Sequence, residues 1–509
     1  MATTTTSDFF GVNSVNYTPD QIVQLQDSKT NDVFSFEKVT TWLDGSTNFI
    51  IDDAIYFKKN NADSTFSYYK RVFYTPINVK WFGALGNGTT DDTIAIRAAF
   101  DFLFDARDYD ISSIIFPEGT YVVTELIGFP SRCELSGIDK NCSKIVTNRN
   151  DHDLLYIFEN KNFNPPNTVS DGQNQLPWTT IKNITIAGMN RNANPFGWYH
   201  ENVTTNNLNS GIVINEVLKT SLENVRVIGF ETAGIHYNKT YYQRFNHIHV
   251  RKNKIGMLVT NTCTSIHGIN SEFQLNSLAH SIQDSFSCSF VNCLIESNFA
   301  QYMINRIDIN DSPFSHNGVA VFLNNSFMNI YSNCYFEAHV CTFYYLNSYE
   351  NIVNNCYIVP GTTHNFTSLD GYCGLYNNST KNTFDKNFHT SVPGSNISVA
   401  KFYFTTNSIS NFFEFNTEDS FNAFISTSAT LTNFSDRTTA PTAICPTANK
   451  SFYNLSVSKL YSLGSFSGTS LQRPPTLNTN IGFEFFDITL NKPIWNDGTN
   501  WRDANGNIV

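Results

Sequence analysis

Two short phrases of the chain place a glutamate in the same frame. VNCLIESN covers residues 291–298 and SNCYFEAH covers residues 332–339, and each reads Asn, Cys, two apolar or aromatic residues, then Glu. Paired carboxylates suit acid–base cleavage of a glycosidic bond, in which one donates a proton and the other acts as base or nucleophile. The repetition therefore indicates either a structural repeat that carries charge, or a site built from successive turns of that repeat.

Three further phrases, ENVRVIGF, HIHVRKN and GINSEFQ, overlay on these two. The overlay places one set of residues in a first column: Val225, Ile248, Ile269, Cys293 and Cys334. A second column, three places on, holds Arg251, Glu272, Glu296 and Glu337, at steps of 21, 24 and 41 residues. A period in the low twenties with no helix between the phrases predicts a parallel β-solenoid. The step of 41 is either two short turns or one turn with the insertion RIDINDSPFSHNG at 306–318.

Alternation along a strand sets which residues face the interior. Cys293 and Ile295 point to one side of the sheet, and Leu294 and Glu296 point to the other. An unpaired charge is costly to bury, so the glutamate column is predicted to face outward. Glutamates on adjacent strands, about 4.7–4.9 Å apart, approach the carboxylate spacing of retaining glycosidases, whereas glutamates two strands apart fit inverting ones. We expect Glu272 and Glu296 to be adjacent, and consider both positions for Glu337.

The candidate site follows from this arrangement. The catalytic candidates are Glu272, Glu296, Glu337 and, from the insertion, Asp308, with Asp311 and His316 beside it. The substrate-binding candidates are Arg251, His249, Tyr302, Tyr335 and Tyr357, because aromatic rings stack on sugars and Arg pairs with acidic ones. The alternatives are that each Glu is a solvated strand residue, and that Tyr335 and Tyr357 pack against a neighbouring subunit.

Composition narrows the class of protein. Of 509 residues, 41% are hydrophobic, 15% are aromatic and 15% are charged, which favours strands over long surface helices. The net charge of −11 and the absence of a Lys/Arg cluster argue against nucleic-acid binding. No window approaches 18 apolar residues and no basic segment leads into an apolar run, so we expect neither membrane insertion nor a secretion signal.

No metal or cofactor site is predicted. The ten Cys residues lack paired CxxC spacing and are interpreted as small buried side chains of a protein made in a reducing cytosol. His247 and His249 are expected on one strand face, but no third ligand follows at a fitting spacing.

The chain divides into three predicted units: 1–75, a lead-in with short strands; 76–440, the solenoid body; and 441–509, a distal segment. A helix after GNGTTDD is expected to begin with Asp91 or Thr90 as its N-cap. Its expected apolar face is Ile94, Ala95, Ala98, Ala99, Phe102 and Leu103. Asp91 and Asp92 are therefore interpreted as capping residues rather than catalytic ones.

Two motifs resemble a known family. GNGTTDDTIAIRAAFDF at 86–102, preceded by VKWFGAL and followed by FPEGTY, resembles the opening of pectate-lyase-like right-handed parallel β-helix proteins, in the version carried by bacteriophage tailspikes. Asn87 stands where the usual phrase has Asp. GFEFFDITLNKPIWNDGTNWRDANG at 482–506 is similar to a C-terminal segment of phage tail fibres and tailspikes, with Asn496 in place of the second Trp.

This resemblance implies an all-β homotrimer in the virion: an N-terminal unit that attaches to the phage tail, a β-helix that binds bacterial capsule or O-antigen, and a C-terminal part that trimerises. It also implies that the protein is made in the host cytoplasm and acts at the cell surface. Many such proteins are endoglycosidases, which is the activity we expect. A binding-only tail fibre and a polysaccharide lyase acting on a uronate remain the alternatives.

Overall fold

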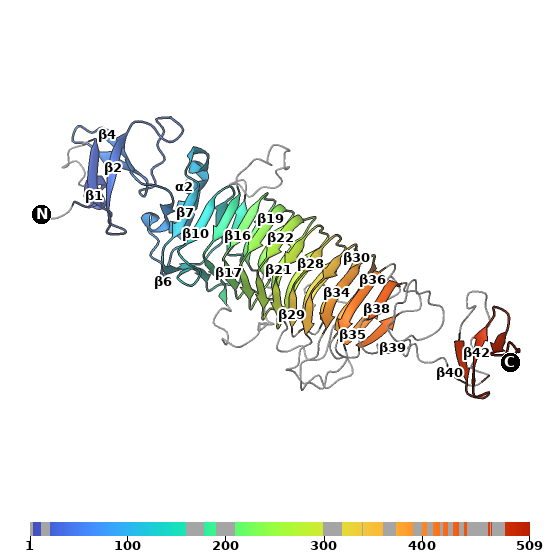
Figure 1. The fold of residues 1–509 in the computed structure, drawn as a ribbon. Helices are drawn as coiled ribbons and strands as arrows, with labels where there is room; N and C mark the ends of the chain where they lie inside the picture. Colours follow the sequence, from blue (N-terminus) through green and yellow to red (C-terminus); the bar gives the residue numbers. More distant parts are fainter. Residues whose placement is uncertain are drawn as a thin grey trace.

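Parallel strands, three in most turns of the chain, build an elongated solenoid (Figure 1); each turn is here called a coil. The computed structural model describes residues 4–11, 21–158, 178–189, 209–298, 318–337, 339, 341–359, 373–389, 400–404, 411–417, 421–425, 431–436, 442–444, 467–468, 470 and 484–509. Strands account for 52% of the structure and helices for 9%, which confirms the all-β class. The long parallel sheets are those of a right-handed β-helix, as predicted.

The three strands of a coil belong to three ladders. The first strands are β5 (Ile77–Asn78), β7 (Ser113–Phe116), β10 (Glu134–Gly137), β13 (Thr179–Lys182), β16 (Thr220–Glu223), β19 (Tyr241–Asn246), β22 (Thr264–Ile269), β25 (Ser289–Val291), β28 (Ile330–Ser332), β31 (Ile352–Asn354), β34 (Thr383–His389), β36 (Asn411–Thr417) and β38 (Leu431–Asp436). The second strands are β6 (Asn87–Asp91), β8 (Gly119–Val123), β11 (Ser143–Thr147), β14 (Thr185–Ala187), β17 (Arg226–Ile228), β20 (His249–Arg251), β23 (Glu272–Gln274), β26 (Leu294–Glu296), β29 (Tyr335–Glu337) and β32 (Tyr357–Val359). The third strands are β9 (Ile127–Pro130), β12 (Leu155–Phe158), β15 (Ser210–Asn215), β18 (Ala233–Asn238), β21 (Ile255–Thr260), β24 (Leu278–Gln283), β27 (Val319–Asn324), β30 (Cys341–Tyr349), β33 (Cys373–Thr380), β35 (Ala400–Phe404), β37 (Phe421–Ile425) and β39 (Thr442–Ile444).

The middle residue of each short second strand points into the solenoid. These residues are apolar and buried along the whole row: Ile186, Val227, Val250, Phe273, Ile295, Phe336 and Ile358. Cys293 is buried as well, whereas Leu294 and Glu296 are only partly buried. The predicted phase, with Cys and Ile inward and Glu outward, is therefore confirmed.

A row of buried asparagines joins successive coils at the end of the second strands. The Oδ1 atom of Asn276 accepts a hydrogen bond from the backbone N–H of Asn253 at 3.0 Å, and its Nδ2 donates to the carbonyl of Val250 at 3.1 Å. Asn298 repeats this pattern one coil further on, with bonds of 3.1 and 2.8 Å. Because a buried polar group without a partner is costly, each amide favours a single alignment of neighbouring coils.

A second row explains the asparagine of the repeated phrases. The turn before each second strand from β14 to β32 contains one residue in the left-handed conformation, with φ of 49–55°: Asn183, Asn224, His247, Asn270, Asn292, Asn333 and Asn355. Asn adopts this conformation at lower cost than most residues. His247 thus lies in a turn while His249 lies on β20. The expectation that the two share a strand face is wrong.

These turns also correct the sequence overlay. Ser271, rather than Ile269, occupies the position of Ile248 and Cys293: its Oγ accepts a hydrogen bond from Ile248 N at 3.2 Å, and its carbonyl accepts one from Leu294 N at 2.9 Å. Ile269 ends β22 and is 41% exposed. The phrase GINSEFQ was therefore placed two residues out of register.

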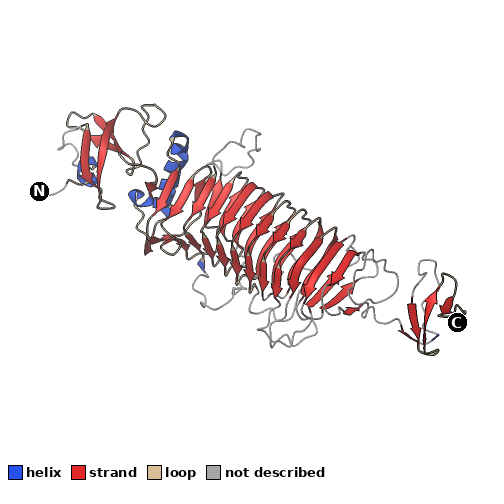
Figure 2. Ribbon diagram, in the orientation of Figure 1, coloured by secondary structure: helices blue, strands red, loops and turns tan. Residues whose placement is uncertain are grey.

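Helix α2 (Thr93–Ala106) lies at the N-terminal end of the solenoid (Figure 2). Ala99, Phe102 and Leu103 are buried as predicted, but Ile94 is 83% exposed. Ile96 and Phe100 pack into the core instead. Phe100 follows Ile96 by four residues and Leu103 follows Phe100 by three, so the three side chains share one face of the helix.

The two aspartates before α2 have structural partners. Asp91 Oδ1 accepts a hydrogen bond from Thr93 N at 3.0 Å, at the start of the helix. Asp92 accepts hydrogen bonds from the backbone N–H groups of Leu85 and Gly86, at 2.7 and 3.1 Å, and so holds the preceding turn. The N-cap residue of α2 is Asp92, which makes no side-chain capping hydrogen bond, so the prediction of Asp91 or Thr90 as the N-cap is wrong. The contacts of the two aspartates nevertheless give both side chains a structural role.

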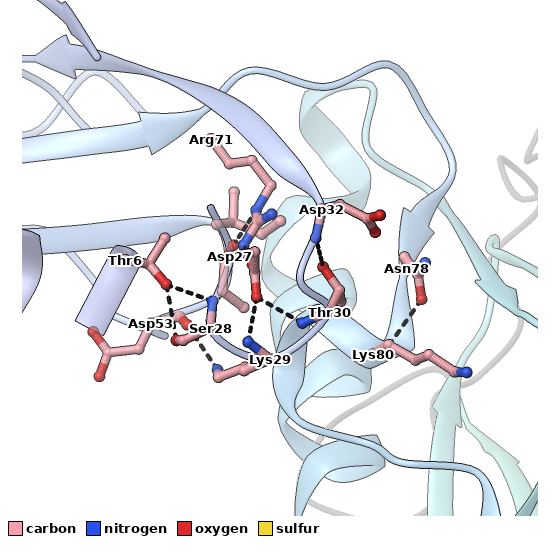
Figure 3. Close-up of polar contacts among 12 residues, drawn as sticks. Thr6, Asp27, Ser28, Lys29, Thr30, Asp32, Asp53, Arg71, Asn78 and Lys80 are labelled. Atoms are coloured by element: carbon pink, nitrogen blue, oxygen red, sulfur yellow. Dashed lines mark hydrogen bonds and ion pairs between the residues drawn. The ribbon is translucent and has the colours of Figure 1, made fainter. Parts of the chain in front are cut away.

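A small antiparallel sheet precedes the solenoid, with strand order β1 (Ile22–Gln26), β2 (Val33–Val39), β4 (Phe66–Arg71), β3 (Tyr56–Asn60), beside the short helix α1 (Thr6–Phe10). Inside it Arg71 and Asp27 form a buried ion pair (Figure 3). The Arg71 guanidinium also lies 4.8 Å from the ring centroid of Trp81, which belongs to the 3₁₀-helix η2 (Val79–Phe82) at the start of the solenoid. Arg71 thereby contacts both parts of the chain.

A second small sheet follows the solenoid. It contains β40 (Ser467–Gly468), β41 (Glu484–Asp487), β42 (Lys492–Asn496) and β43 (Trp501–Asp503), around a core that includes Phe485, Ile494 and Trp501. Asn496, where a Trp is usual, accepts a hydrogen bond from Gly498 N at 2.7 Å. The homotrimer and the unit boundaries stay predictions. No helix in the described ranges is long and apolar enough to cross a membrane.

We expect Asn276→Ala to lower the stability of the solenoid by roughly 2–4 kcal/mol, because it leaves the N–H of Asn253 and the carbonyl of Val250 without these buried partners. Thermal unfolding of the full chain measures this. Asn246→Ala, on the outer side of β19 where the Asn246 side chain accepts a long hydrogen bond of 3.4 Å, is the matched control and should change stability little. Equal effects of the two substitutions would contradict the role of the buried asparagine row in aligning the coils.

We expect Asp27→Ala to destabilise the N-terminal sheet by about 3–5 kcal/mol, since it leaves the fully buried Arg71 guanidinium without its counter-charge. Hydrogen exchange of the amides in β1–β4 measures the local effect. Asp151→Ala removes the partner of Arg149 in an exposed pair and should leave exchange unchanged. Unaltered exchange in Asp27→Ala would show that the buried pair is dispensable.

Candidate functional site

The outward residues of the second strands form two columns along one face, here called the site face. The first column contains Arg226, His249, Glu272, Leu294, Tyr335 and Tyr357. The second column contains Ile228, Arg251, Gln274, Glu296, Glu337 and Val359. Each step within a column crosses to the neighbouring strand, about 4.8 Å away.

The predicted column is thus correct for Arg251, Glu296 and Glu337, and wrong for Glu272. Gln274 fills the place assigned to Glu272, which pairs with Leu294 in the other column. The cause is the two-residue offset of GINSEFQ described above. Glu272 and Glu296 are therefore diagonal neighbours, one strand and two residues apart, with Cα atoms roughly 8 Å apart by strand geometry.

Glu296 and Glu337 are directly paired on adjacent strands, β26 and β29. The step of 41 residues is therefore a single coil with an insertion, and the alternative of two turns is wrong. Two carboxylates at this spacing repel each other. Burial, and then the charge of Glu337, raise the pKa of Glu296, while a hydrogen bond donated by Gln274 Nε2 at 2.9 Å opposes the shift. Burial and the charge of Glu337 both favour the protonated form of Glu296.

Glu337 is held by a neighbouring phenol. Tyr335 Oη donates a hydrogen bond to Glu337 Oε2 at 2.8 Å. Burial and this carboxylate raise the pKa of Tyr335 well above its usual value, so the phenol remains protonated as the donor. The Tyr335 ring stacks on that of Tyr357, at 5.5 Å between centroids and 6° between planes. Tyr357 is 40% exposed and forms the accessible end of this aromatic pair.

The opposite end of the site face is cationic. His249 Nδ1 lies 3.6 Å from Glu272 Oε2, and its Nε2 lies 3.3 Å from Lys140 Nζ. Lys140 comes from the turn after β10, 109 residues earlier in the chain. Burial lowers the pKa of His249, and the charges of Lys140, Arg226 and Arg251 lower it further, against the opposing effect of Glu272.

Several predicted residues lie outside the described part of the chain: Tyr302, Asp308, Asp311 and His316. Three residues of this region were not predicted from the sequence: Arg226 and Gln274 of the site face, and Lys140 beside it. Arg226 belongs to the phrase ENVRVIGF and shares the column of His249, so the overlay contained its signal. Lys140 carries no repeat signal, since it lies in a turn.

Within the described residues, no group of three or more His, Cys, Asp and Glu side chains is arranged to hold a metal ion. Most of the cysteines with described side chains are buried.

Comparison with solved structures finds matches of low sequence identity. A protein of Geobacillus virus E2 is 16% identical, with a TM-score of 0.45 over 82% of this chain and 74% of that one. The enzymatically active domain of bacteriophage CBA120 tailspike protein 2 is 12% identical, with a TM-score of 0.49 over 82% and 57% of the two chains. A mannuronan C-5 epimerase A-module from Azotobacter vinelandii is 13% identical, with a TM-score of 0.44 over 76% and 98%.

Sequence comparison finds a short match and a long one. The plasmin and fibronectin-binding protein A of Streptococcus pneumoniae is 28% identical over 155 residues, which are 30% of this chain and only 20% of that protein. The family described as rhamnogalacturonase A/epimerase, pectate lyase-like, matches residues 76–382. This match begins at the predicted start of the solenoid, includes the whole site face and spans more than half of the chain. The chain therefore belongs to the rhamnogalacturonase A/epimerase, pectate lyase-like family.

Proposed function

We propose that this protein is a phage tailspike that binds a bacterial surface polysaccharide, capsule or O-antigen, and hydrolyses it on the site face. The observation that carries the proposal is the direct pairing of Glu296 with Glu337 on adjacent strands, with the pKa of Glu296 raised. The family description names a rhamnogalacturonase and an epimerase, which supports chemistry on carbohydrate.

In the proposed mechanism Glu296 is the acid and Glu337 the nucleophile. Protonated Glu296 donates its proton to the glycosidic oxygen as the bond to the anomeric carbon breaks, and the Glu337 carboxylate attacks that carbon to form a glycosyl ester. Glu296, now ionised, takes a proton from water, which hydrolyses the ester. The spacing of adjacent strands, about 4.8 Å, favours this retaining route over an inverting one.

The surrounding groups suit these roles. Tyr335 orients the Glu337 carboxylate through its 2.8 Å hydrogen bond, and Gln274 orients that of Glu296. Tyr357 is 40% exposed and lies next to the pair, where a sugar ring would contact it. Glu272, diagonal to Glu296, provides the wider spacing of an inverting pair and is the alternative base.

The virion context rests on the two sequence motifs. VKWFGAL with GNGTTDD, and the segment 482–506, support a tail protein that trimerises and attaches through its N-terminal unit to the phage tail. On this proposal the partners are the polysaccharide, two further copies of the chain, and a tail or adaptor protein. Synthesis in the host cytoplasm and action at the bacterial surface follow from the same proposal.

One feature favours a lyase as the second candidate. Lys140 and His249 are in contact, beside Arg226 and Arg251. Such a group would neutralise a uronate carboxylate and accept the proton next to it. A lyase releases an unsaturated product that absorbs in the ultraviolet, whereas hydrolysis releases reducing ends without that absorbance.

We expect Glu296→Gln and Glu337→Gln each to lower kcat on the host polysaccharide by about 10³-fold or more, because each removes a group that acts on the reacting bond. Release of reducing ends from purified capsule and O-antigen measures this. Glu216→Gln, a partly buried glutamate paired with Lys239 and lying after a third strand, is the control and should retain activity.

The products distinguish the two geometries. Retention of configuration at the anomeric carbon, measured by NMR, supports the pair Glu296 and Glu337. Inversion, together with a large loss of activity in Glu272→Gln, would replace Glu337 by Glu272 as the partner. Full activity in both Glu296→Gln and Glu337→Gln would overturn the proposed site.

The raised pKa of Glu296 predicts a pH profile. Activity falls as pH rises through the pKa of the acid, so the alkaline limb of kcat/KM follows Glu296. Gln274→Ala removes a hydrogen bond that stabilises the ionised form, which should raise the pKa of Glu296 and move this limb to higher pH. Glu272→Gln removes a repelling charge and should move it to lower pH. Shifts in the same direction would contradict the assignment of Glu296 as the acid.

A further inference from the structure

The site face carries a compact group of cations, here called the cationic cluster: Lys140, Arg226, His249 and Arg251. Arg226 and His249 are direct partners on β17 and β20, and Arg251 lies two residues beyond His249. Lys140 Nζ lies 3.3 Å from His249 Nε2. Since an ammonium group only donates, His249 Nε2 is the acceptor, and the imidazole is neutral with its proton on Nδ1, toward Glu272.

The positive charge of this cluster is incompletely balanced. The acidic groups that act on it are Glu272 and Asp139, against the cations Lys140, Arg226 and Arg251. Burial and the charge of Arg226 lower the pKa of Lys140, and burial and the charge of Arg251 lower that of Arg226. Partly desolvated cations that repel one another are stabilised by an added anion.

Arg251 has an unused donor. Its Nε is buried and, within the described part of the chain, has no hydrogen-bond partner. Arg226 uses one donor, Nη2, on Asn141 Oδ1 at 3.0 Å. A planar guanidinium with a free donor matches the geometry of a carboxylate or phosphate oxygen.

The cluster lies at a fixed distance from the paired glutamates. Arg251 and Glu296 share a column and are separated by one strand, β23, so they are roughly 10 Å apart along the solenoid axis. The strand spacing is close to the length of one pyranose unit. Consider a glycan that runs along the site face with its scissile glycosidic bond at Glu296 and Glu337. The sugar that lies over the cationic cluster is then about two units from that bond.

We infer that the cationic cluster is a subsite for an anionic substituent, a carboxylate or a phosphate, on a sugar about two units from the scissile bond. The substrate is then an acidic polysaccharide with its charge at that position. This inference rests on the proposed function, because the position of the cleaved bond is taken from the Glu296 and Glu337 pair.

Binding and turnover test the subsite on a panel of purified bacterial capsules and O-antigens, acidic and neutral. The wild-type chain is expected to bind acidic polymers. For a cleaved uronate polymer, chemical reduction of its carboxyl groups should raise KM roughly 10-fold or more, whereas for a phosphate-bearing polymer removal of the phosphate should do so. Arg251→Ala and Arg226→Ala should raise KM for the native polymer by a similar factor and leave kcat at saturation within about twofold.

The control is Arg244→Ala, which removes an arginine from the first strand of the same coil as Arg251. Its guanidinium lies over the ring of Trp178 rather than on the site face, and KM should not change. Arg251→Lys keeps the charge but loses the planar donors, and should restore part of the affinity.

The outcomes separate the two claims. Equal KM effects of Arg251→Ala on the native polymer and on its neutral derivative would overturn the subsite, as would binding to neutral polymers alone, while leaving the proposed hydrolysis intact. Absence of binding to, or cleavage of, every polymer by the wild-type chain would overturn the proposed function and the subsite together. Loss of kcat with unchanged KM in the arginine variants would assign the cluster to the chemical step and overturn the binding role.

Discussion

Every outward side chain of the site face depends on the buried amides that align one coil with the next. Asn276 and Asn298 each hold two backbone groups of the preceding coils, in an interior where water cannot replace a lost hydrogen bond. A slip between coils would break these bonds, so one alignment is favoured. The partners across the strands, and with them the distances between functional groups, follow from that alignment.

The chemical character of the site face changes along the solenoid axis. Cations lie at one end, on β17 and β20, the glutamate pair lies on β26 and β29, and the stacked tyrosines lie on β29 and β32. Because each strand advances the face by about 4.8 Å, chemically different groups are presented at intervals that suit successive sugars of a chain. The solenoid thus spreads recognition and cleavage over several strands, rather than concentrating them in one loop.

Electrostatics links the two ends of this face. Glu272 lies between them: it opposes the positive charge around His249, and it contributes to the raised pKa of Glu296. A residue first considered as one of three equivalent acids therefore has a different physical situation from Glu296. Its contact with His249 at 3.6 Å makes it a link between the cationic cluster and the glutamate pair.

The sequence alone determined the class of fold, the inward direction of Cys293 and Cys334, and the place of Arg251 in one outward column with Glu296 and Glu337. These follow from local chemistry: period-two alternation in short strands, the cost of burying charge, and Asn in left-handed turns. It did not determine the partner of Glu272, because a shift of two residues keeps every side chain on the same face. Only the tertiary structure, through the hydrogen bonds of Ser271 and Asn276, decided that register. It also brought Lys140 to His249 across 109 residues, a contact that no local pattern encodes.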